Sequence, residues 1–543
     1  MTNLQNYRTL VEKTLGELKN DQIMERIWKR DHQVWNTKAT EISNRLGWLD
    51  IARRMQAEVE KINEFVSGVQ QDGFTHALLL GMGGSSLAPE VLRKTYGVKP
   101  GFLDLAVLDS TDPGAVLHFA RELDARKTLY IVSTKSGGTV ETFSFMRYFF
   151  NLLAEDIGSE DAGTHFIAIT DPGSKLAEVA EEFHFRHIFL NDPNIGGRYS
   201  ALSHFGLVPA ALLGVELDRL LQNTVLMMNA CSAGTPTGKN PAALLGAAMG
   251  ELAKQGRDKL TFVLSPSIAS FGDWMEQLVA ESTGKDGKGI LPVVNEELLD
   301  VSTYARDRVF FHLELEPELF HSQKIGELEA AGFPVIRVKI NDLYELGAQF
   351  FIWELATAVA GHILDIHPFD QPNVEAAKVL AREMVAAYKQ DGKLPESGFQ
   401  PADAQKLWDF LAGAESGRSY VSLQAYLMPS SETTSALQKL RSSIQSKYKV
   451  ATTAGYGPRF LHSTGQLHKG DGGNGFFIQF LGTPPEDTLI PDEMGSAESS
   501  LSFGVLEAAQ AGGDAQALVN NQRKLIQFRL GKDPAAEISR LMP

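Results

Sequence analysis

An amide and an ammonium stand seven residues apart in a stretch that reads like the start of a helix. Residues 367–378 have the sequence HPFDQPNVEAAK, which contains Gln371 and Lys378. Seven residues correspond to about two turns of an α-helix, so both side chains can lie on one face. Such a face suits a polar, oxygen-rich ligand. An ordinary helix entered through proline, with a solvated lysine, explains this stretch equally well, so other motifs must decide between the two.

Two loops rich in glycine and hydroxyl groups each follow a predicted strand. The first is GMGGSS at residues 81–86, which alone is as consistent with a tight turn as with a ligand site. The second is STKSGGTVET at residues 133–142, with four hydroxyls and one lysine within its first seven residues. Helix N-termini offer free N–H groups to anions, and hydroxyls with a lysine can surround a phosphate. A helix cap requires only one hydroxyl, so the pair of loops predicts a phosphate site.

A guanidinium and a carboxylate follow in two further motifs. In NIGGRYS, at residues 194–200, two glycines let the backbone fold tightly and direct Arg198 inward, although a surface turn is the alternative. In WMEQLVAESTGK, at residues 274–285, Glu281 ends an apolar helix just before a glycine turn. Partial burial there would raise the pKa of the carboxyl toward that of a useful general base. Most glutamates at helix ends are solvated, and Glu276 is the competing carboxylate.

Composition and charge exclude several classes of protein. The chain has 543 residues, a formal net charge of −16 and a pI of about 5.4. Such a field repels nucleic acid and anionic membranes, so an anionic substrate requires a local cationic pocket. The single cysteine, Cys231, excludes an internal disulfide and lies in an apolar helical pattern that predicts burial. No apolar run approaches membrane length, and we expect a cytoplasmic enzyme without a nucleic-acid or membrane partner.

Alternating strand and helix patterns must position these motifs. Residues 1–70 predict a helical N-terminal cap. Buried strands at residues 76–80, 105–108, 129–132 and 165–169 predict a first doubly wound α/β domain over residues 71–222. Strands at residues 260–264, 309–313 and 334–338, with a core helix at 348–364, predict a second such domain over residues 223–412. Strand candidates at residues 420–426, 475–481 and 524–530 predict a further α/β segment over residues 413–543.

The motifs together resemble one family. GMGGSS, TKSGGTVET, IGGRYS, QLVAESTGK and FDQPNVEAAK occur in the order seen in glucose-6-phosphate isomerases. The resemblance covers roughly residues 75–380, and GGRYSALS and FDQ..VE..K closely follow the two signature segments of the family. The tail GPRFLHSTGQLHKG, at residues 457–470, looks more like the isomerase half of fused transaldolase–isomerase proteins. A transaldolase barrel has no room here, because the first sheet begins by residue 75.

The resemblance implies a fold, a reaction and a set of site residues. It implies two sugar-isomerase (SIS) domains and interconversion of glucose 6-phosphate and fructose 6-phosphate through a cis-enediol, in glycolysis and gluconeogenesis. It also implies a homodimer that uses no cofactor or metal. Glu281 matches the base that moves a proton between C1 and C2, and Arg198 the guanidinium that stabilises the enediolate. Gln371 matches a residue near the sugar, and Lys378 one that helps to open the ring. The residues that match the phosphate site are Ser85, Thr134, Lys135, Ser136 and Thr139.

The chain departs from the family at one position. The common family form has a ring-opening histidine shortly after the catalytic glutamate, but residues 285–305 contain no histidine. His312 lies in an apolar strand pattern and is expected in the core. The tail offers His462 and His468, and we weigh replacement of the missing acid–base group by one of them against a purely structural role for both. Two alternative functions stay open: a phosphosugar-binding protein without catalysis, and an isomerase that also accepts mannose 6-phosphate.

Overall fold

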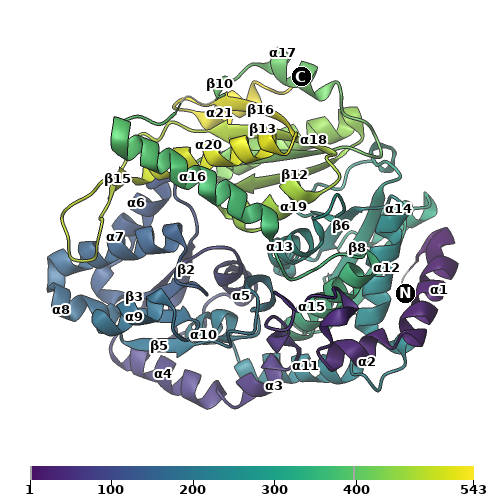
Figure 1. The fold of residues 1–543 in the computed structure, drawn as a ribbon, viewed down its shortest axis with the longest axis horizontal. Helices are drawn as coiled ribbons and strands as arrows, with labels where there is room; N and C mark the ends of the chain where they lie inside the picture. The colour runs from purple at the N-terminus through teal and green to yellow at the C-terminus, as the bar shows by residue number, and fades with distance from the viewer. Residues whose placement is uncertain (1–2, 319, 396–397) are drawn as a thin grey trace.

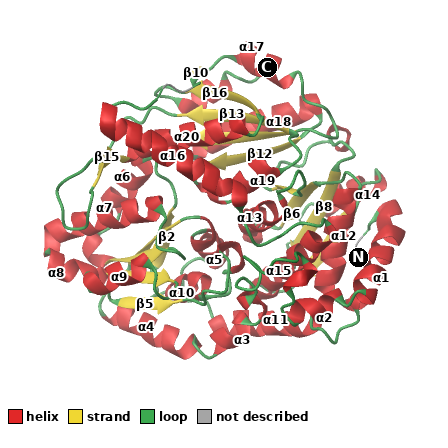
Figure 2. Cartoon of the chain, in the orientation of Figure 1, coloured by secondary structure: helices red, strands yellow, loops and turns green. Residues whose placement is uncertain are grey.

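Three parallel β-sheets form the frame of the protein, and helices enclose each of them (Figures 1 and 2). The computed structural model describes residues 3–318, 320–395 and 398–543. The strand orders are β2-β1-β3-β4-β5, β7-β6-β8-β9 and β12-β11-β13-β16-β10. If the two-residue β10 is set aside, each sheet has its first strand inside, its second strand on one side and its later strands on the other. This doubly wound arrangement places ligand sites at the carboxyl ends of the strands.

Four helices precede the first sheet and confirm the predicted helical N-terminal region. Val11, Leu15 and Leu18 form the buried face of the first of these helices, which packs against α12. The indole of Trp28 donates to the main-chain oxygen of Cys231 at 2.8 Å, and Cys231 is buried as predicted. These contacts attach the N-terminal helices to the helical layer of the second sheet. The four helices are α1 (Arg8–Asn20), α2 (Ile23–Trp28), α3 (Ile51–Gln56) and α4 (Val59–Gln71).

The first sheet is built from short, almost wholly apolar strands, as expected for parallel strands covered on both faces. Adjacent β1 and β3 are in register from His76 opposite Thr128 to Gly81 opposite Ser133, so the two hydroxyl-rich loops leave the same edge. The elements are β1 (His76–Gly81), α5 (Leu87–Tyr96), β2 (Asp104–Leu108), α6 (Pro113–Glu122), β3 (Thr128–Ser133), α7 (Val140–Ile157), α8 (Ser159–Ala162), β4 (Phe166–Thr170), α9 (Lys175–Glu182), β5 (His187–Leu190) and α10 (His204–Leu212).

The second sheet packs on the predicted core helix, α15, which is buried from Leu346 to Gly361. His312 lies inside β8 and is buried, as its apolar surroundings in the sequence predicted. The elements are α11 (Leu217–Ala230), α12 (Pro241–Lys254), β6 (Lys259–Leu264), α13 (Phe271–Thr283), β7 (Leu291–Val293), β8 (Arg308–Leu315), α14 (Ser322–Ala330), β9 (Val335–Ile340), α15 (Leu346–Ile363) and α16 (Pro372–Asp391).

The C-terminal segment forms the third sheet, with two strands beyond the three that were predicted. Helix α16 packs against α20 of this segment, so it leaves the second sheet and lies across the third (Figure 1). The domain boundaries predicted from the sequence, at residues 70, 222 and 412, remain a prediction. The elements are β10 (Gln400–Pro401), α17 (Ala404–Leu411), β11 (Tyr420–Tyr426), α18 (Ser431–Tyr448), β12 (Ala451–Tyr456), α19 (Gly465–Gly470), β13 (Gly475–Leu481), β14 (Leu489–Ile490), β15 (Leu501–Ser502), α20 (Phe503–Asn520), β16 (Lys524–Arg529) and α21 (Pro534–Ser539).

The fold class is therefore α/β, with two doubly wound parallel sheets, a helical N-terminal region and an additional α/β segment, as predicted. Among the described residues, no helix is both long enough and apolar enough to cross a membrane.

Candidate active site

Two short 3-10 turns bring two of the sequence motifs, GMGGSS and NIGGRYS, into contact. The turn Gly83–Ser85 follows β1, and the turn Gly197–Tyr199 carries Arg198. A Cβ atom on Gly84 would lie only 2.1 Å from the main-chain oxygen of Gly197, so the two backbones touch and only glycine fits. This close approach fixes the guanidinium of Arg198 beside the GMGGSS loop.

The hydroxyl groups predicted to bind phosphate gather at the edge shared by β1 and β3. Thr134 Oγ1 lies 3.0 Å from Thr139 Oγ1, and Thr139 is the cap residue directly before α7. Ser133 Oγ donates to the main-chain oxygen of Ser85 at 3.2 Å, which links the two loops. Ser136 is exposed on the same loop. Thr134 and Thr139 thus place two hydroxyls at the start of an 18-residue helix, a favourable place for an anion.

Lys135 does not point toward these hydroxyls. Its ammonium pairs with a carboxylate oxygen of Asp171 and donates to the main-chain oxygen of Pro193 at 3.0 Å. Burial raises the pKa of Asp171, although the charge of Lys135 opposes the change. The sequence could not show this pairing, because Asp171 follows a different strand. Lys135 is adjacent to the expected phosphate position, but its charge is neutralised within the protein.

Arg198 is buried, with 3% of its side chain exposed, and its guanidinium donates four hydrogen bonds and forms an ion pair with Glu281. Nε donates to Ser282 Oγ at 2.9 Å, and Nη2 donates to the main-chain oxygens of Pro368 and Asp370 at 2.8 and 3.0 Å. Nη1 donates to Gln371 Oε1 at 3.0 Å and lies 3.1 Å from Glu281 Oε1. The planar fork therefore joins the second-sheet helix α13 to the loop before α16.

Glu281 lies in the last turn of α13, and two donors hold its carboxylate. Oε1 faces Arg198, while Oε2 accepts from Nε2 of Gln277 at 3.1 Å. Gln277 is four residues earlier on the same helix, so helical spacing alone brings the amide beside the carboxylate. With 12% of its side chain exposed, the carboxylate is fixed in position yet accessible. This is the geometry that a general base requires.

Glu276, the competing carboxylate, lies elsewhere. It lines a different cavity together with Asp273, Arg459 and Ser463. Burial, with the nearby charge of Asp273, raises the pKa of Glu276 to about 8. None of the residues expected to bind the substrate lines that cavity, so Glu281 is the better candidate for the base.

Lys285 holds the loop that Arg198 binds. Its Nζ donates to the main-chain oxygen of Asp370 at 2.5 Å and to Asp370 Oδ1 at 2.9 Å, and only 2% of its side chain is exposed. Burial, reinforced by the charge of Arg198, lowers the pKa of Lys285 to about 8. The helix predicted after this loop is confirmed, because α16 begins at Pro372 with Gln371 as its cap residue.

The tail reaches the site through His462. This residue ends the 3-10 turn Arg459–His462, and its main-chain oxygen accepts from Nε2 of Gln277 at 2.7 Å. A Cβ atom on Gly83 would lie 2.9 Å from the same oxygen, so the tail packs directly on the GMGGSS loop. The structure thus brings His462 beside the groups that hold Glu281. Its part in ring opening stays a prediction.

The imidazole of His462 has a carboxylate partner that we did not predict. Its Nε2 lies 3.0 Å from Oε1 of Glu141, in the first turn of α7. Burial by itself would raise the pKa of Glu141, but the charge and hydrogen bond of His462, and the charge of Lys378, hold that pKa below its ordinary value. Glu141 stands in the TVET part of the hydroxyl-rich motif, and only its position beside a helix start marked it in the sequence.

Lys378 lines a cavity of about 200 Å³ between α7, α16, α20 and the tail. Thr139, Glu141 and His462 line the same cavity, so the lysine of the FDQ..VE..K segment faces the hydroxyl loop and the tail histidine. Gln371, seven residues earlier, binds Arg198. Both members of the amide–ammonium pair therefore lie beside residues of the candidate site, Gln371 at Arg198 and Lys378 at His462.

His468 does not belong to it. The residue is buried on α19 of the C-terminal segment. Its Nδ1 lies 3.1 Å from Nε2 of Gln424, and its ring packs on Phe477. Burial lowers the pKa of His468 well below its ordinary value. The expectation that His468 reaches the site is not supported, because α19 directs this side chain into the core beneath the third sheet.

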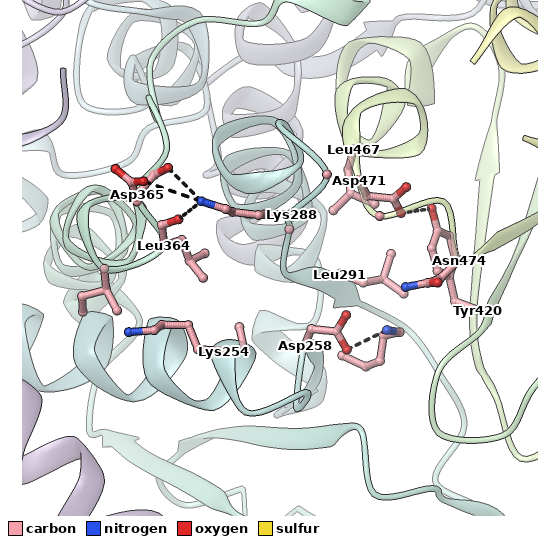
Figure 3. A pocket seen from close by; sticks show the side chains of 16 residues that line it. Lys254, Asp258, Lys288, Leu291, Leu364, Asp365, Tyr420, Leu467, Asp471 and Asn474 are labelled. Carbon is pink, nitrogen blue, oxygen red and sulfur yellow. Dashed lines mark hydrogen bonds and ion pairs between the residues drawn. The ribbon is translucent and has the colours of Figure 1, made fainter. Parts of the chain in front are cut away.

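A larger cavity, of about 590 Å³, lies away from these residues and is shown in Figure 3. It opens where β6, β7 and β11 begin, at the amino ends of the strands. Its lysines are engaged: Lys288 donates to the main-chain oxygen of Leu364 at 2.8 Å, and Lys259 contacts Asp258 at 2.6 Å. None of the predicted site residues lines it. Within the described residues, no group of three or more His, Cys, Asp or Glu side chains could hold a metal ion.

Comparisons with known proteins agree with this geometry. The family model for phosphoglucose isomerase matches residues 46–293, which include Arg198 and Glu281 but not Gln371, Lys378 or His462. The glucose-6-phosphate isomerase of Thermosynechococcus vestitus is 32% identical over 375 residues, or 61% of this chain and 69% of that protein. A probable glucose-6-phosphate isomerase of Methanococcus maripaludis is 28% identical over 403 residues, or 66% of this chain and 88% of that protein.

Two solved structures share the fold. A hypothetical protein from Thermus thermophilus superimposes with a TM-score of 0.61 at 24% identity, over 71% of this chain and all of that one. A glucose-6-phosphate isomerase from Chlamydia trachomatis gives a TM-score of 0.53 at 21% identity, over 67% of this chain and 78% of that one. The sequence match to the relative from Thermosynechococcus vestitus, with the family model, shows that the chain belongs to the phosphoglucose isomerase family.

Proposed function

We propose that the protein is an aldose–ketose isomerase that interconverts glucose 6-phosphate and fructose 6-phosphate. Family membership and the names of the relatives support this function. The observation that carries it is the carboxylate of Glu281, held between Arg198 and Gln277 next to two hydroxyl-rich loops at the edge of a parallel sheet. A base, a fixed cation and an anion-binding helix start are the parts that this isomerisation requires.

The phosphate is expected at the start of α7. Thr134 and Thr139 would donate from their hydroxyls, Ser85 and Ser136 would complete the ring of donors, and the helix start adds main-chain N–H groups. Lys135 can contribute its charge only if the phosphate dianion competes with Asp171 for the ammonium.

Glu281 then moves a proton between adjacent carbons. In the open-chain aldose, its carboxylate removes the proton from C2; the electrons of that bond form the C1–C2 double bond, and the carbonyl electrons move to O1. The resulting enediolate carries negative charge that the guanidinium of Arg198 stabilises. Protonated Glu281 returns the proton to C1, where the electrons of the C1–C2 double bond form the new C–H bond. The proton of O2 passes to O1, O2 becomes the carbonyl oxygen, and the ketose is formed. In this structure, Nη1 is the guanidinium nitrogen of Arg198 that contacts the Glu281 carboxylate.

Ring opening is assigned to His462 with Lys378. The Glu141 carboxylate accepts from Nε2 of His462, so that nitrogen carries a proton and Nδ1 is the one free to act as a base. Nδ1 would take the proton of the C1 hydroxyl while the bond from C1 to the ring oxygen breaks. The ring oxygen would receive a proton from Lys378, which lines the same cavity.

A coupled assay tests the proposal. Purified protein is incubated with fructose 6-phosphate, and glucose 6-phosphate is measured through a reporter dehydrogenase. The Glu281→Gln variant separates catalysis from simple binding, because a phosphosugar-binding protein would keep its ligand affinity and show no turnover in either form. Mannose 6-phosphate is assayed in parallel, since selection at C2 depends on the shape of the pocket. Absence of turnover in the wild-type protein would refute the proposed function.

The two tail histidines offer a matched pair for the ring-opening step. Deuterium uptake at C2 of erythrose 4-phosphate reports proton transfer alone, because this aldose phosphate cannot close a five- or six-membered ring. We expect His462→Ala to slow turnover of cyclic glucose 6-phosphate far more than this exchange. His468→Ala serves as the control for loss of a buried imidazole and should affect both reactions alike. Equal effects of His462→Ala on the two reactions would show that another group opens the ring.

Three finer expectations remain predictions, the first drawn from the pattern of the sequence and the other two from the family resemblance. They are a cytoplasmic location, a homodimeric state and a special closeness to the isomerase half of fused transaldolase–isomerase proteins. Sedimentation of the purified protein measures the second directly.

A further inference from the structure

One oxygen of Glu141 accepts two hydrogen bonds, and the second donor comes from the far end of the chain. Oε1 lies 3.0 Å from Nε2 of His462 and 2.7 Å from Nε2 of Gln510. Gln510 lies on α20 of the C-terminal segment, and 5% of the residue is exposed. Helix α7, beside the first sheet, therefore supplies the carboxylate, while the C-terminal segment supplies both donors.

The amide of Gln510 is fixed in one orientation. Its Oε1 accepts from Oγ1 of Thr111 at 2.7 Å, and Thr111 is completely buried in the loop after β2. An ionised carboxylate can only accept, so the NH₂ group must face Glu141 and the carbonyl oxygen must face the hydroxyl. Rotation of the amide by half a turn would place its oxygen against the carboxylate and leave the Thr111 hydroxyl facing NH₂. The local chemistry thus selects the orientation found.

We propose that Gln510 is a positioning residue for the Glu141–His462 pair. By donating to Oε1, its amide holds the carboxylate toward His462 and stabilises its ionised form. The carboxylate in turn keeps the proton of His462 on Nε2 and leaves Nδ1 directed to proton exchange with the substrate. This assignment rests on the proposed function, because it gives Gln510 a part in ring opening and none in proton transfer between C1 and C2.

The other charged groups around the Glu141–His462 pair lie on α16, α19 and α20. Lys378 and Arg382 of α16 and Lys469 of α19 line the cavity beside Glu141. Lys469 is paired with Asp514 at 2.5 Å, one turn beyond Gln510 on α20. These groups stay unchanged when the amide alone is removed, so a change in pH dependence can be traced to it.

The test compares Gln510→Met, Thr111→Val and a control, Gln516→Met. Methionine keeps the length of the side chain without the hydrogen bonds, and valine removes only the hydroxyl that orients the amide. Gln516 lies on the same helix but is exposed and bonded to Asn520. For Gln510→Met we expect turnover of cyclic glucose 6-phosphate to fall by about tenfold or more. We expect the acidic limb of its pH profile to move up by about one pH unit.

Exchange at C2 of erythrose 4-phosphate should stay at the wild-type rate in Gln510→Met. Thr111→Val should shift the limb in the same direction by a smaller amount, and it decides the question if the methionine variant does not fold. The role of Gln510 would be overturned if folded variants kept the acidic limb of the wild-type pH profile. They would also have to keep the wild-type ratio of glucose 6-phosphate turnover to erythrose 4-phosphate exchange. A wild-type protein without isomerase activity would instead overturn the proposed function, so the two failures are distinguishable.

Discussion

Replacement of Arg198 by lysine keeps the positive charge and tests whether the shape of the guanidinium matters. The guanidinium of Arg198 donates to Ser282, Gln371 and two main-chain oxygens at 2.8–3.0 Å, and Nη1 lies 3.1 Å from Oε1 of Glu281. An ammonium has three donors, so at least two of these acceptors lose their partner. Hydrogen bonds to charged groups contribute roughly 1.5–3 kcal/mol each, which gives a loss of roughly 3–6 kcal/mol in local stability.

The catalytic effect of Arg198→Lys should be separable from this loss. Removal of one preorganised donor at a site of developing charge lowers turnover by roughly 10²–10³-fold. The assay measures kcat and KM for fructose 6-phosphate at a temperature where the variant is folded, with thermal unfolding recorded alongside. Arg441→Lys is the control, because Arg441 is another buried guanidinium whose fork binds main-chain oxygens of Val294 and Thr452, away from Glu281. The control should lose stability and keep kcat.

Three results bear on the interpretation of Arg198. A large fall in kcat in Arg198→Lys, without a fall in the control, supports direct electrostatic stabilisation. A comparable fall in both variants would show that any buried fork matters only for folding. If Arg198→Lys keeps most of its turnover, the guanidinium is structural and the enediolate must be stabilised by another group.

Three further predictions address the base, the phosphate loop and a buried lysine. Glu281→Gln should lower turnover by at least about 10²–10⁴-fold with little change in the affinity of a competitive inhibitor; near-normal turnover would remove Glu281 from the mechanism. The double change Lys135→Ala with Ser136→Ala should raise KM for fructose 6-phosphate steeply and leave kcat nearly intact, and an unchanged KM would make the loop a simple helix start. Because the pKa of Lys285 is lowered to about 8 from 10.5, the unfolded chain binds more protons between these values, and the contribution of Lys285 to stability should rise with pH across that window. The thermal midpoint of the wild-type protein should therefore rise relative to that of Lys285→Met from pH 8 to 10. A constant difference between the two midpoints over this range would contradict the lowered pKa of Lys285.

The parts of the site that the sequence predicted are those that lie at the ends of neighbouring strands. Parallel strands deliver their carboxyl ends to one edge, so the strand pattern alone is enough to expect that the loops with Ser85 and Thr139 meet. The position of Glu281 at the end of an apolar helix made it a candidate, and the resemblance to the family implied its role as the base. The helix after Gln371 followed from its proline entry.

The remaining parts depend on contacts between distant segments, which no local pattern reports. The pairing of Lys135 with Asp171 joins loops after two different strands. The two tail histidines lie on different elements: His462 ends the 3-10 turn that packs on the GMGGSS loop and faces Glu141, whereas His468 lies on α19 and points into the core. The packing of α16 on α20 likewise follows from tertiary structure, since the sequence of α16 alone fits either neighbour.

The bonds at Oε1 of Glu141 have a consequence for the order in which the protein becomes active. Glu141 is separated from His462 by 321 positions and from Gln510 by 369. During synthesis the first two sheets can fold around their own local contacts, whereas this pair of bonds must await nearly the whole chain. Contacts between such distant segments also form late in folding, because the intervening chain has to be ordered first. If His462 opens the ring as proposed, we expect activity toward the cyclic sugar to appear only when the third sheet has docked, so a nascent chain without the docked tail should lack ring opening.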